Sequence, residues 1–356
     1  MKKILLLFLC SQFFCLYSKD LYRIRYNNKF GYIDKNLTIV INPQYDYAEN
    51  FIENYAIIAN TKENNTFYSV INKNNKLPDE KLSNCARLFR VSKSIFYNSF
   101  DGYFYDITQH KNISLSKNSL PYFNNFSQDF LYPRNNFDSD SIEYIDINQN
   151  IKLSSNEWRK AFPMTDNIAF VIKKDWSQVI INNNGEEIIK NIYDCGINPS
   201  EGLLPVQTNA ESGYINNKGD FIILCSFEPN LHVFSPPGLN YPFSEGVAAV
   251  QTRKGIFKIF DLQGNTIMDE KSLLDMKPCS NGLILYQTLD NKFGYFNKEG
   301  KSVFNTEFEY AESFNKEFAL VNYKGKDAIL DKKGNIFLSE DLVLGKKKSI
   351  INVLNH

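Results

Sequence analysis

Residues 29–34 read KFGYID, and residues 292–297 repeat the pattern as KFGYFN. Aromatic, apolar and polar side chains alternate along both stretches, which is typical of a β-strand. Each stretch ends on Asp or Asn, and this residue recurs along the chain at an average spacing of about 37 residues. The sequence therefore predicts nine related units, marked by Asp34, Asn72, Asp106, Asp146, Asn182, Asn216, Asp261, Asn297 and Asp331.

The other parts of the unit also recur. A turn such as Asp261-Leu-Gln-Gly264 follows the first strand, with Asp or Asn first and Gly fourth. The Asp or Asn side chain accepts hydrogen bonds from backbone N–H groups in a type I turn, and Gly supplies a left-handed residue. A second apolar strand, a loop with aromatic or acidic residues and a third strand complete the unit. Third strands are expected at residues 55–59, 168–172, 247–251 and 318–322.

Short strands rich in Phe, Tyr, Ile and Val predict an all-β chain. One three-stranded unit cannot bury its apolar face alone, so about nine antiparallel units are expected to stack as a tandem array. We favour a β-propeller-like array, with an open β-solenoid as the alternative. A ring could close in two ways. The strand at residues 21–26 could pair with the last hairpin at 327–338, or residues 349–354 could complete the last unit.

Taken together, these features resemble the WG repeat of bacterial exported proteins. That repeat combines an aromatic-Gly pair, a Tyr-Ile-Asp strand, a Lys-x-Gly turn, a Tyr-Asp pair and a Phe-Ser-x-Gly junction. The resemblance covers most of residues 21–338 and implies an exported or envelope-associated protein that mediates interactions, without catalytic residues. The residues that carry it are Phe30, Gly31, Tyr45, Asp46, Gly213, Phe243, Gly246, Phe293, Gly294 and Phe314.

The chain departs from this repeat in two places. Trp176 stands near the position of the aromatic-Gly pair, but Ser177 follows it in place of Gly. Residues 75–140 match poorly, with longer loops and fewer glycines. This stretch is either a decayed pair of units or a specialised binding surface.

The first eighteen residues have the form of a secretory signal. Two lysines precede an apolar stretch at residues 4–17, which is shorter than the about 20 residues that cross a bilayer. We predict a signal peptide over residues 1–18 and a repeat array over residues 19–356, in a protein of the periplasm, the cell envelope or the extracellular space.

A lipoprotein is the alternative form of export. It would be attached to the membrane through Cys10 or Cys15. The residues directly before these cysteines, Leu9 and Phe14, are larger than those that such processing favours. Simple cleavage after Ser18 is therefore the preferred prediction.

Charge and motifs argue against several classes of protein. The 40 Lys and Arg residues balance 40 Asp and Glu residues, whereas nucleic-acid-binding proteins carry a basic patch. Three scattered histidines, single acidic residues in the turns and no short cysteine spacing predict neither a metal site nor a cofactor site. We find no catalytic motif and expect no enzyme. Unpaired core cysteines are expected at Cys85, Cys195, Cys225 and Cys279.

Two features are candidates for binding. The loop from Phe227 to Tyr241 is enlarged and also carries His232 and Phe234, and long loops on rigid scaffolds often bind ligands. Aromatic residues also recur in the loops, where they are expected mainly to pack between units. Exposed members would suit sugars or protein partners. These rings belong to Tyr45, Tyr47, Phe51, Tyr122, Phe123, Phe126, Tyr193, Tyr241, Tyr310 and Phe314.

Three hypotheses for the function follow from this pattern. The first is a scaffold that binds another macromolecule of the envelope or extracellular space, with a protein as the preferred partner. The second is a carbohydrate-binding or carbohydrate-cleaving propeller. The third is a structural protein that assembles with its own copies.

Overall fold

A computed structural model describes residues 20–354, apart from positions 92, 114–130, 137, 147–149, 197–198, 228–240, 253–254 and 305–306. The predicted signal peptide, with Cys10 and Cys15, lies outside these residues. The described strands form nine separate antiparallel sheets. None of the described helices is both long and apolar enough to span a membrane. The prediction of an all-β, nine-unit array is confirmed.

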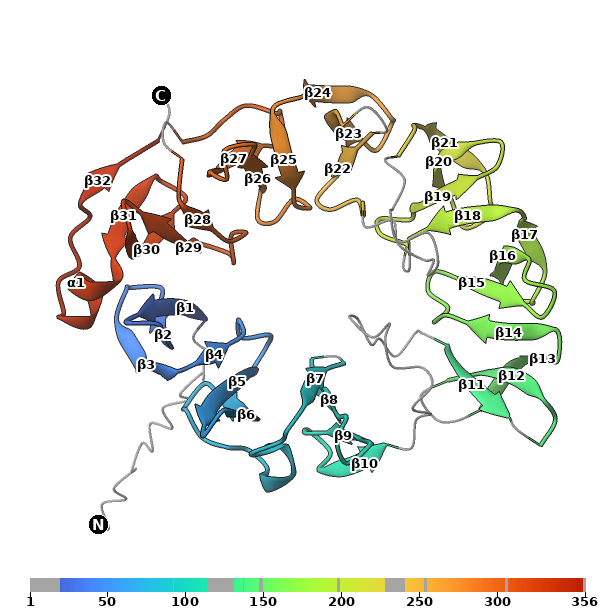
Figure 1. Ribbon diagram of the computed structural model, residues 1–356, viewed down its shortest axis with the longest axis horizontal. Helices are drawn as coiled ribbons and strands as arrows, with labels where there is room; N and C mark the ends of the chain where they lie inside the picture. Colours follow the sequence, from blue (N-terminus) through green and yellow to red (C-terminus); the bar gives the residue numbers. More distant parts are fainter. Residues whose placement is uncertain are drawn as a thin grey trace, which may run out of the picture.

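The sheets follow one another around a ring, in the order of the chain (Figure 1). The first three are β1–β2–β3 (Leu21–Tyr26, Lys29–Asp34, Ile39–Tyr45), β4–β5–β6 (Tyr47–Ala48, Tyr55–Lys62, Asn65–Asn72) and β7–β8–β9–β10 (Leu88–Arg90, Ile95–Asn98, Tyr103–Asp106, Lys111–Ile113). The middle three are β11–β12–β13 (Tyr132–Asn136, Ser141–Ile145, Ile151–Ser155), β14–β15–β16–β17 (Trp158–Ala161, Ile168–Lys173, Gln178–Asn182, Glu187–Ile189) and β18–β19–β20–β21 (Ile192–Cys195, Leu204–Thr208, Ser212–Ile215, Phe221–Leu224).

The remaining three sheets complete the ring. They are β22–β23–β24 (Val247–Gln251, Phe257–Asp261, Thr266–Glu270), β25–β26–β27 (Leu273–Met276, Leu283–Thr288, Phe293–Asn297) and β28–β29–β30–β31–β32 (Tyr310–Ala311, Phe318–Tyr323, Lys326–Asp331, Asn335–Leu338, Ile351–Asn352). Two short helices accompany them, the 3-10 helix η1 (Glu80–Leu82) and α1 (Ser339–Val343). In Figure 1, β7 and β28 lie toward the middle of the ring, and β10 and β32 lie at its periphery.

The sequence unit and the sheet differ in phase. The third strand of a unit was expected to close that unit, but it pairs with the first strand of the next one, as β5 pairs with β6. A tight hairpin joins these two strands, whereas the preceding aromatic loop crosses to the neighbouring sheet. That loop also adds short strands such as β4 and β28. The last sheet has five strands because both β28 and β32 add to its three central strands.

The predicted turns are confirmed. After β23, the Asp261 carboxylate accepts hydrogen bonds from the backbone N–H groups of Gln263 at 3.0 Å and Asn265 at 2.8 Å. Gly264 closes the turn with a φ of 84°, a conformation that glycine adopts without steric cost. Asn216 and Asp331 accept from the backbone in the same way.

The core is divided into clusters that lie between adjacent sheets. One cluster joins β4–β6 to β7–β10 through residues such as Ile57, Leu88 and Phe96. Most sheets pack on both faces. In β15, for example, Ala169 and Val171 belong to one cluster, and Ile168 and Phe170 belong to the next. Among the described residues, no such cluster joins β7–β10 to β11–β13, whose connecting residues 114–130 lie outside the described part.

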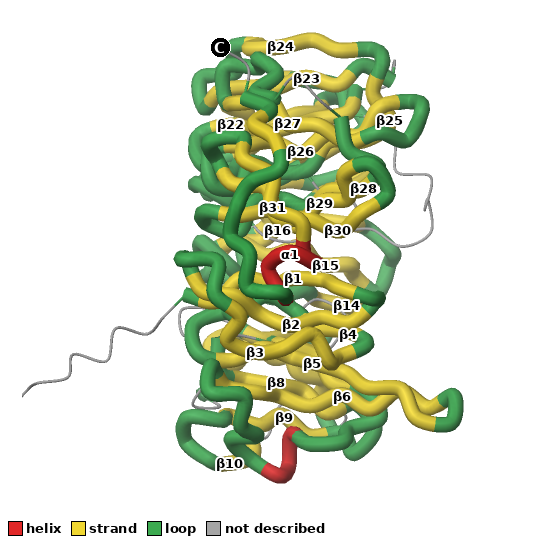
Figure 2. The backbone as a smooth tube through the Cα atoms, turned by 90° about the vertical axis from the view of Figure 1, so that its left-hand side faces the viewer, coloured by secondary structure: helices red, strands yellow, loops and turns green. Residues whose placement is uncertain are grey.

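The first and last sheets also pack together. Tyr22 and Ile24 of β1 share a cluster with Phe318 and Leu320 of β29 and with Leu342 of α1. Figure 2 shows β1, β30 and α1 side by side. The C-terminal strand β32 pairs with β31, while β1 pairs with β2, so the C-terminal segment completes the last sheet. The two ends are therefore joined by side-chain packing, and their described strands belong to separate sheets.

The Phe-Ser-x-Gly junctions link neighbouring sheets. The Ser200 hydroxyl donates to the Phe243 carbonyl at 2.6 Å, and the Ser244 hydroxyl donates to the Cys279 carbonyl at 2.7 Å. Glu245 then accepts from the backbone N–H of Gly282 at 2.7 Å. Burial raises the pKa of Glu245, but the backbone hydrogen bonds outweigh it and leave that pKa below its usual value. Each of these junctions is thus hydrogen-bonded to the equivalent junction of the next sheet.

The tyrosine of the repeated Gly-Tyr strand has a second linking role. The hydroxyls of Tyr32 and Tyr295 donate to the backbone carbonyls of Glu49 and Glu312, each at 2.7 Å and each in the following sheet. Tyr144 makes the equivalent bond to Phe162. Burial raises the pKa of Tyr32, Tyr144 and Tyr295, which keeps these hydroxyls protonated as donors.

These hydroxyls predict a measurable contribution to stability. Tyr295→Phe should lower the free energy of unfolding by about 1 to 2 kcal/mol, because a buried carbonyl loses its hydrogen-bond donor. Tyr193→Phe, at a tyrosine that is 43% exposed, is the control and should change stability little. Denaturant unfolding measures both variants, and equal effects would contradict a bridging role for Tyr295.

Candidate binding site

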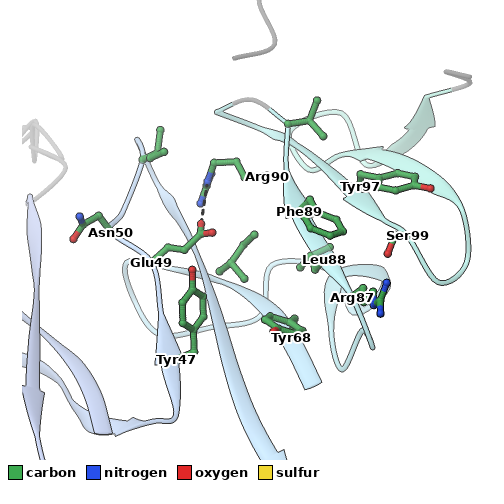
Figure 3. Close-up of a pocket in the computed structure, with 13 residues that line it drawn as sticks. Tyr47, Glu49, Asn50, Tyr68, Arg87, Leu88, Phe89, Arg90, Tyr97 and Ser99 are labelled. Carbon is green, nitrogen blue, oxygen red and sulfur yellow. Dashed lines mark hydrogen bonds and ion pairs between the residues drawn. The ribbon is translucent and has the colours of Figure 1, made fainter. Parts of the chain in front are cut away.

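A large cavity opens between the second and third sheets, beside their inner strands β4 and β7. Its volume is about 1150 Å³, enough for several amino-acid residues or sugar rings. Figure 3 shows the side chains of both sheets around it. The lining residues are Tyr47, Glu49, Asn50, Ile52, Ile57, Tyr68, Arg87, Leu88, Phe89, Arg90, Val91, Tyr97 and Ser99.

Each sheet contributes a pair of aromatic rings to the cavity. Tyr47 and Tyr68 meet edge to face at 6.3 Å, and Phe89 and Tyr97 stack at 6.5 Å between ring centroids. Tyr47 is 42% exposed and Phe89 is 54% exposed. Successive side chains of a strand point to opposite faces, so β7 buries Leu88 and leaves the Phe89 ring accessible.

An ion pair joins the two sheets at the cavity. The Nε of Arg90 lies 3.4 Å from the Glu49 carboxylate, and its Nη2 donates to the Tyr55 carbonyl at 2.9 Å (Figure 3). The guanidinium also lies 4.9 Å from the ring centroid of Phe96. Burial raises the pKa of the Glu49 carboxyl, and Arg90 offsets this effect only in part. The pair therefore fixes the two sheets relative to each other.

Arg87 differs from the other charged residues of the cavity. Its side chain is exposed and makes no ion pair with any described residue. Its carbonyl accepts from the Ser99 backbone N–H at 3.3 Å, which continues the β7–β8 ladder past Leu88. Arg87 lies in the bend that directly precedes β7, and both Arg87 and Phe89 line the cavity.

The predicted binding loop is only partly described. Phe227 is fully buried and stacks on Tyr241 at 5.6 Å between centroids, inside the cluster that joins the sixth and seventh sheets. These two rings thus have a packing role. His232 and Phe234 lie outside the described residues.

The residues of the repeat signature mostly shape the strands and the core. Gly31, Gly213 and Gly294 allow close approach, since a Cβ on each would collide with Ile41, Ile223 or Tyr286 respectively. The remaining members pack or pair locally. Tyr45, Phe243 and Phe314 are buried, Phe30 and Phe293 pack at the edges of clusters, Gly246 has a φ of 87°, and Asp46 pairs with Lys29.

Trp176 has a different environment from the aromatic-Gly pairs. It occupies the turn between β15 and β16, where 65% of it is exposed. The Arg159 guanidinium lies 3.9 Å from its ring centroid. Trp176 therefore contributes no buried ring to the core.

The recurring loop rings divide into two groups. Phe51 packs on Tyr32 at 4.7 Å between centroids and belongs to the core. Tyr47, Tyr193 and Tyr310 lie on the short inner strands and are 42%, 43% and 37% exposed. Only the first of these three lines the cavity. Tyr122, Phe123 and Phe126 lie outside the described residues.

No metal-ligating cluster of three or more His, Cys, Asp or Glu side chains occurs among the described residues. Cys85, Cys195, Cys225 and Cys279 are free. Burial raises the pKa of Cys85 to about 11 and that of Cys279 to about 12, so these thiols are poor nucleophiles at neutral pH.

Sequence reasoning identified only part of this site. Tyr47 was among the loop rings, and Phe89 and Arg90 fall within residues 75–140, one reading of which was a specialised binding surface. The Glu49–Arg90 pair spans 41 positions of the chain, and no local pattern around Arg90 indicates it. The repetition of Tyr-Ala-Glu at residues 47–49 and 310–312 was the available clue, because each Glu pairs with an Arg of the following sheet.

Comparison with known proteins bears on the repeat and the fold. The sequence model of the WG containing repeat matches residues 30–60 and 293–326, which confirms the resemblance over these two segments. No curated protein matches the sequence.

Solved structures align with all or part of the chain at low sequence identity. A crystal structure of the eukaryotic initiation factor aligns with 95% of this chain and 98% of its own, at 12% identity and a TM-score of 0.55. Hsv2p of Kluyveromyces lactis covers 69% of this chain and 92% of its own, at 11% identity and a TM-score of 0.38. BamB of Moraxella catarrhalis covers 58% and 69%, at 13% identity and a TM-score of 0.28. The likeness to the initiation factor, at 12% identity, concerns the fold alone.

Proposed function

We propose that this protein is an exported, non-catalytic repeat scaffold that binds a macromolecule, a protein in the first instance, through the cavity between β4 and β7. The single observation that carries the proposal is the cavity of about 1150 Å³ with the exposed rings of Tyr47 and Phe89 on opposing sheets. Exposed aromatic side chains in a concave site are typical anchors for a partner. The signal-like residues 1–18 support the exported location.

The chemistry of the lining supports binding over catalysis. Among the described residues that line the cavity, Glu49 carries the only carboxylate, and Arg90 already pairs with it. Glycoside cleavage generally requires two carboxyl groups that face the substrate. The rigid ion pair and the aromatic pairs instead give a fixed surface, which lowers the entropy lost when a partner binds.

The test compares partner capture by the wild type and by a cavity variant. The tagged protein is crosslinked to its partners in its native cells and purified. Mass spectrometry then identifies the captured partners. The double variant Tyr47→Ala/Phe89→Ala should reduce recovery of a saturable partner at least tenfold, because each anchor ring contributes about 1 to 2 kcal/mol or more. Undiminished capture by the variant would contradict the proposed site.

Tyr193→Ala is the matched control for this comparison. Tyr193 is 43% exposed and lies on the inner strand β18, in a different sheet. Its replacement should leave capture unchanged. A glycan array with the same proteins tests the carbohydrate alternative, which the exposed ring faces favour. Glycan retention that depends on Tyr47 and Phe89, without a protein partner, would replace the protein-binding proposal.

A further inference from the structure

The charges of the described residues that line the cavity do not cancel. These residues carry three charged side chains, Glu49, Arg87 and Arg90, and Glu49 pairs with Arg90. Glu53, which follows the cavity residue Ile52, pairs with Lys93 at 2.8 Å and does not neutralise Arg87. One positive charge therefore stands exposed at the edge of the cavity, beside Phe89.

The apolar part of the lining selects against a hydroxyl-rich ligand. Ile57, Leu88 and Val91 present buried aliphatic side chains, and Ile52 is 43% exposed. Sugar hydroxyls placed against such groups would lose hydrogen bonds to water without replacement. A bulky apolar side chain makes no hydrogen bonds to water, so its burial here would cost none, and it would gain contact with Tyr47 and Phe89.

The backbone at the cavity suits an extended chain. β7 is the terminal strand of its sheet, since it pairs with β8 and stands at the end of the order β10–β9–β8–β7. A peptide can add to such an edge as a further strand, with main-chain hydrogen bonds for affinity and alternate side chains for specificity. Arg87 and Phe89 both line the cavity beside this edge, and they lie two residues apart in the chain.

From these three observations we propose that the cavity binds an extended acidic peptide segment of a partner protein, with an aromatic or large aliphatic anchor between Tyr47 and Phe89. An Asp or Glu two residues from the anchor pairs with Arg87. The two-residue spacing follows from the matching periodicity of two neighbouring strands. This inference rests on the proposed function and specifies the partner that the same cavity recognises.

The probe is a phage-displayed library of random dodecapeptides, selected on the purified protein. Enriched peptides should combine a large apolar residue with Asp or Glu two positions away. Resynthesised peptides should bind the Arg87→Glu variant at least about tenfold more weakly, because a charge attraction becomes a repulsion. Selection on that variant should enrich Lys or Arg at the same spacing.

The remaining variants serve as controls. Phe89→Ala should weaken binding of the selected peptides about tenfold, while Tyr193→Ala should leave it within about twofold of the wild type. Denaturant unfolding of each variant confirms that the fold is retained, which is expected for the exposed Arg87. Three outcomes would overturn the inference. They are a selection that enriches no peptide, enriched peptides that lack Asp and Glu, and peptide binding that Arg87→Glu does not change.

The outcomes separate this inference from the proposed function. If Tyr47→Ala/Phe89→Ala abolishes capture of the native partner but Arg87→Glu does not, the cavity is the binding site and acidic recognition is wrong. If neither change affects capture, the proposed function itself fails.

Discussion

Replacement of Arg23 by alanine should lower the free energy of unfolding by about 3 kcal/mol, because it removes one partner of a largely buried ion pair. Arg23 lies on β1 and reaches both neighbouring sheets. Its Nη1 donates to the Ala48 carbonyl at 2.5 Å, and its Nη2 pairs with the Glu312 carboxylate. The side chains of Arg23 and Glu312 are only 14% and 20% exposed. Loss of the Arg23 guanidinium would leave the Glu312 carboxylate without its cation, at the place where the two ends of the chain meet.

A second ion pair at the same junction provides the control. Lys316 and Asp20 lie 2.7 Å apart, but their side chains are 57% and 44% exposed, so water and salt screen them. Lys316→Ala should therefore change stability little. Denaturant unfolding compares the two variants, and a double-mutant cycle with Glu312→Gln isolates the contribution of the pair. Equal losses for Arg23→Ala and Lys316→Ala would show that the ion pair does not hold the junction.

Gly31→Ala is expected to have an effect of similar size, a loss of about 3 kcal/mol, since the new Cβ would overlap backbone atoms that cannot rotate away. These atoms belong to Ile41, Asn42 and Pro43, at the irregular pairing of β2 with β3. Gly31 has no positive φ, so the cost arises from the collision and not from a strained backbone. The strand β3 would have to move away from β2.

Gly294 occupies the same repeat position and gives the matched comparison. A Cβ there would collide with the end of the Tyr286 side chain, which can adjust by rotation. Tyr286 is buried and stacks on Phe296 at 4.2 Å between centroids, so its shift has a cost, but one side chain moves more easily than a paired strand. Gly294→Ala should therefore cost about 2 kcal/mol, less than Gly31→Ala. Unfolding midpoints of the two single variants decide the question. Similar midpoints would mean that the backbone contact at Gly31 is not limiting.

The parts of the fold that sequence reasoning predicted well depend on local interactions. The hydrogen bonds of Asp261 to the N–H groups of Gln263 and Asn265 lie within one turn, and the pattern Asp-Leu-Gln-Gly at residues 261–264 predicts them directly. The third strands at 55–59 and 318–322 also occur where expected, within β5 and β29. Alternation, turn residues and spacing were sufficient for these elements.

The phase of the sheets and the binding site depend on packing between sheets. The repeat does not show whether the strand at 55–59 pairs backward or forward, since either pairing buries the same apolar residues. Nor does it show that Arg90 meets Glu49, because the residue types alone allow many other pairings. Phe227 illustrates the opposite error, as its place in an enlarged loop suggested binding and its ring is buried in the core.

The residue pattern is enough to identify this chain as a β-repeat array of nine units with Asp or Asn turns. Those features are encoded within a few neighbouring residues and recur often enough to be recognised. Three further features become visible only in the folded chain: the C-terminal strand completes the last sheet, Arg23 joins three sheets, and Tyr47 and Phe89 share a cavity. These contacts form between residues distant in the chain, and their geometry is set by the stacking of neighbouring sheets around the ring.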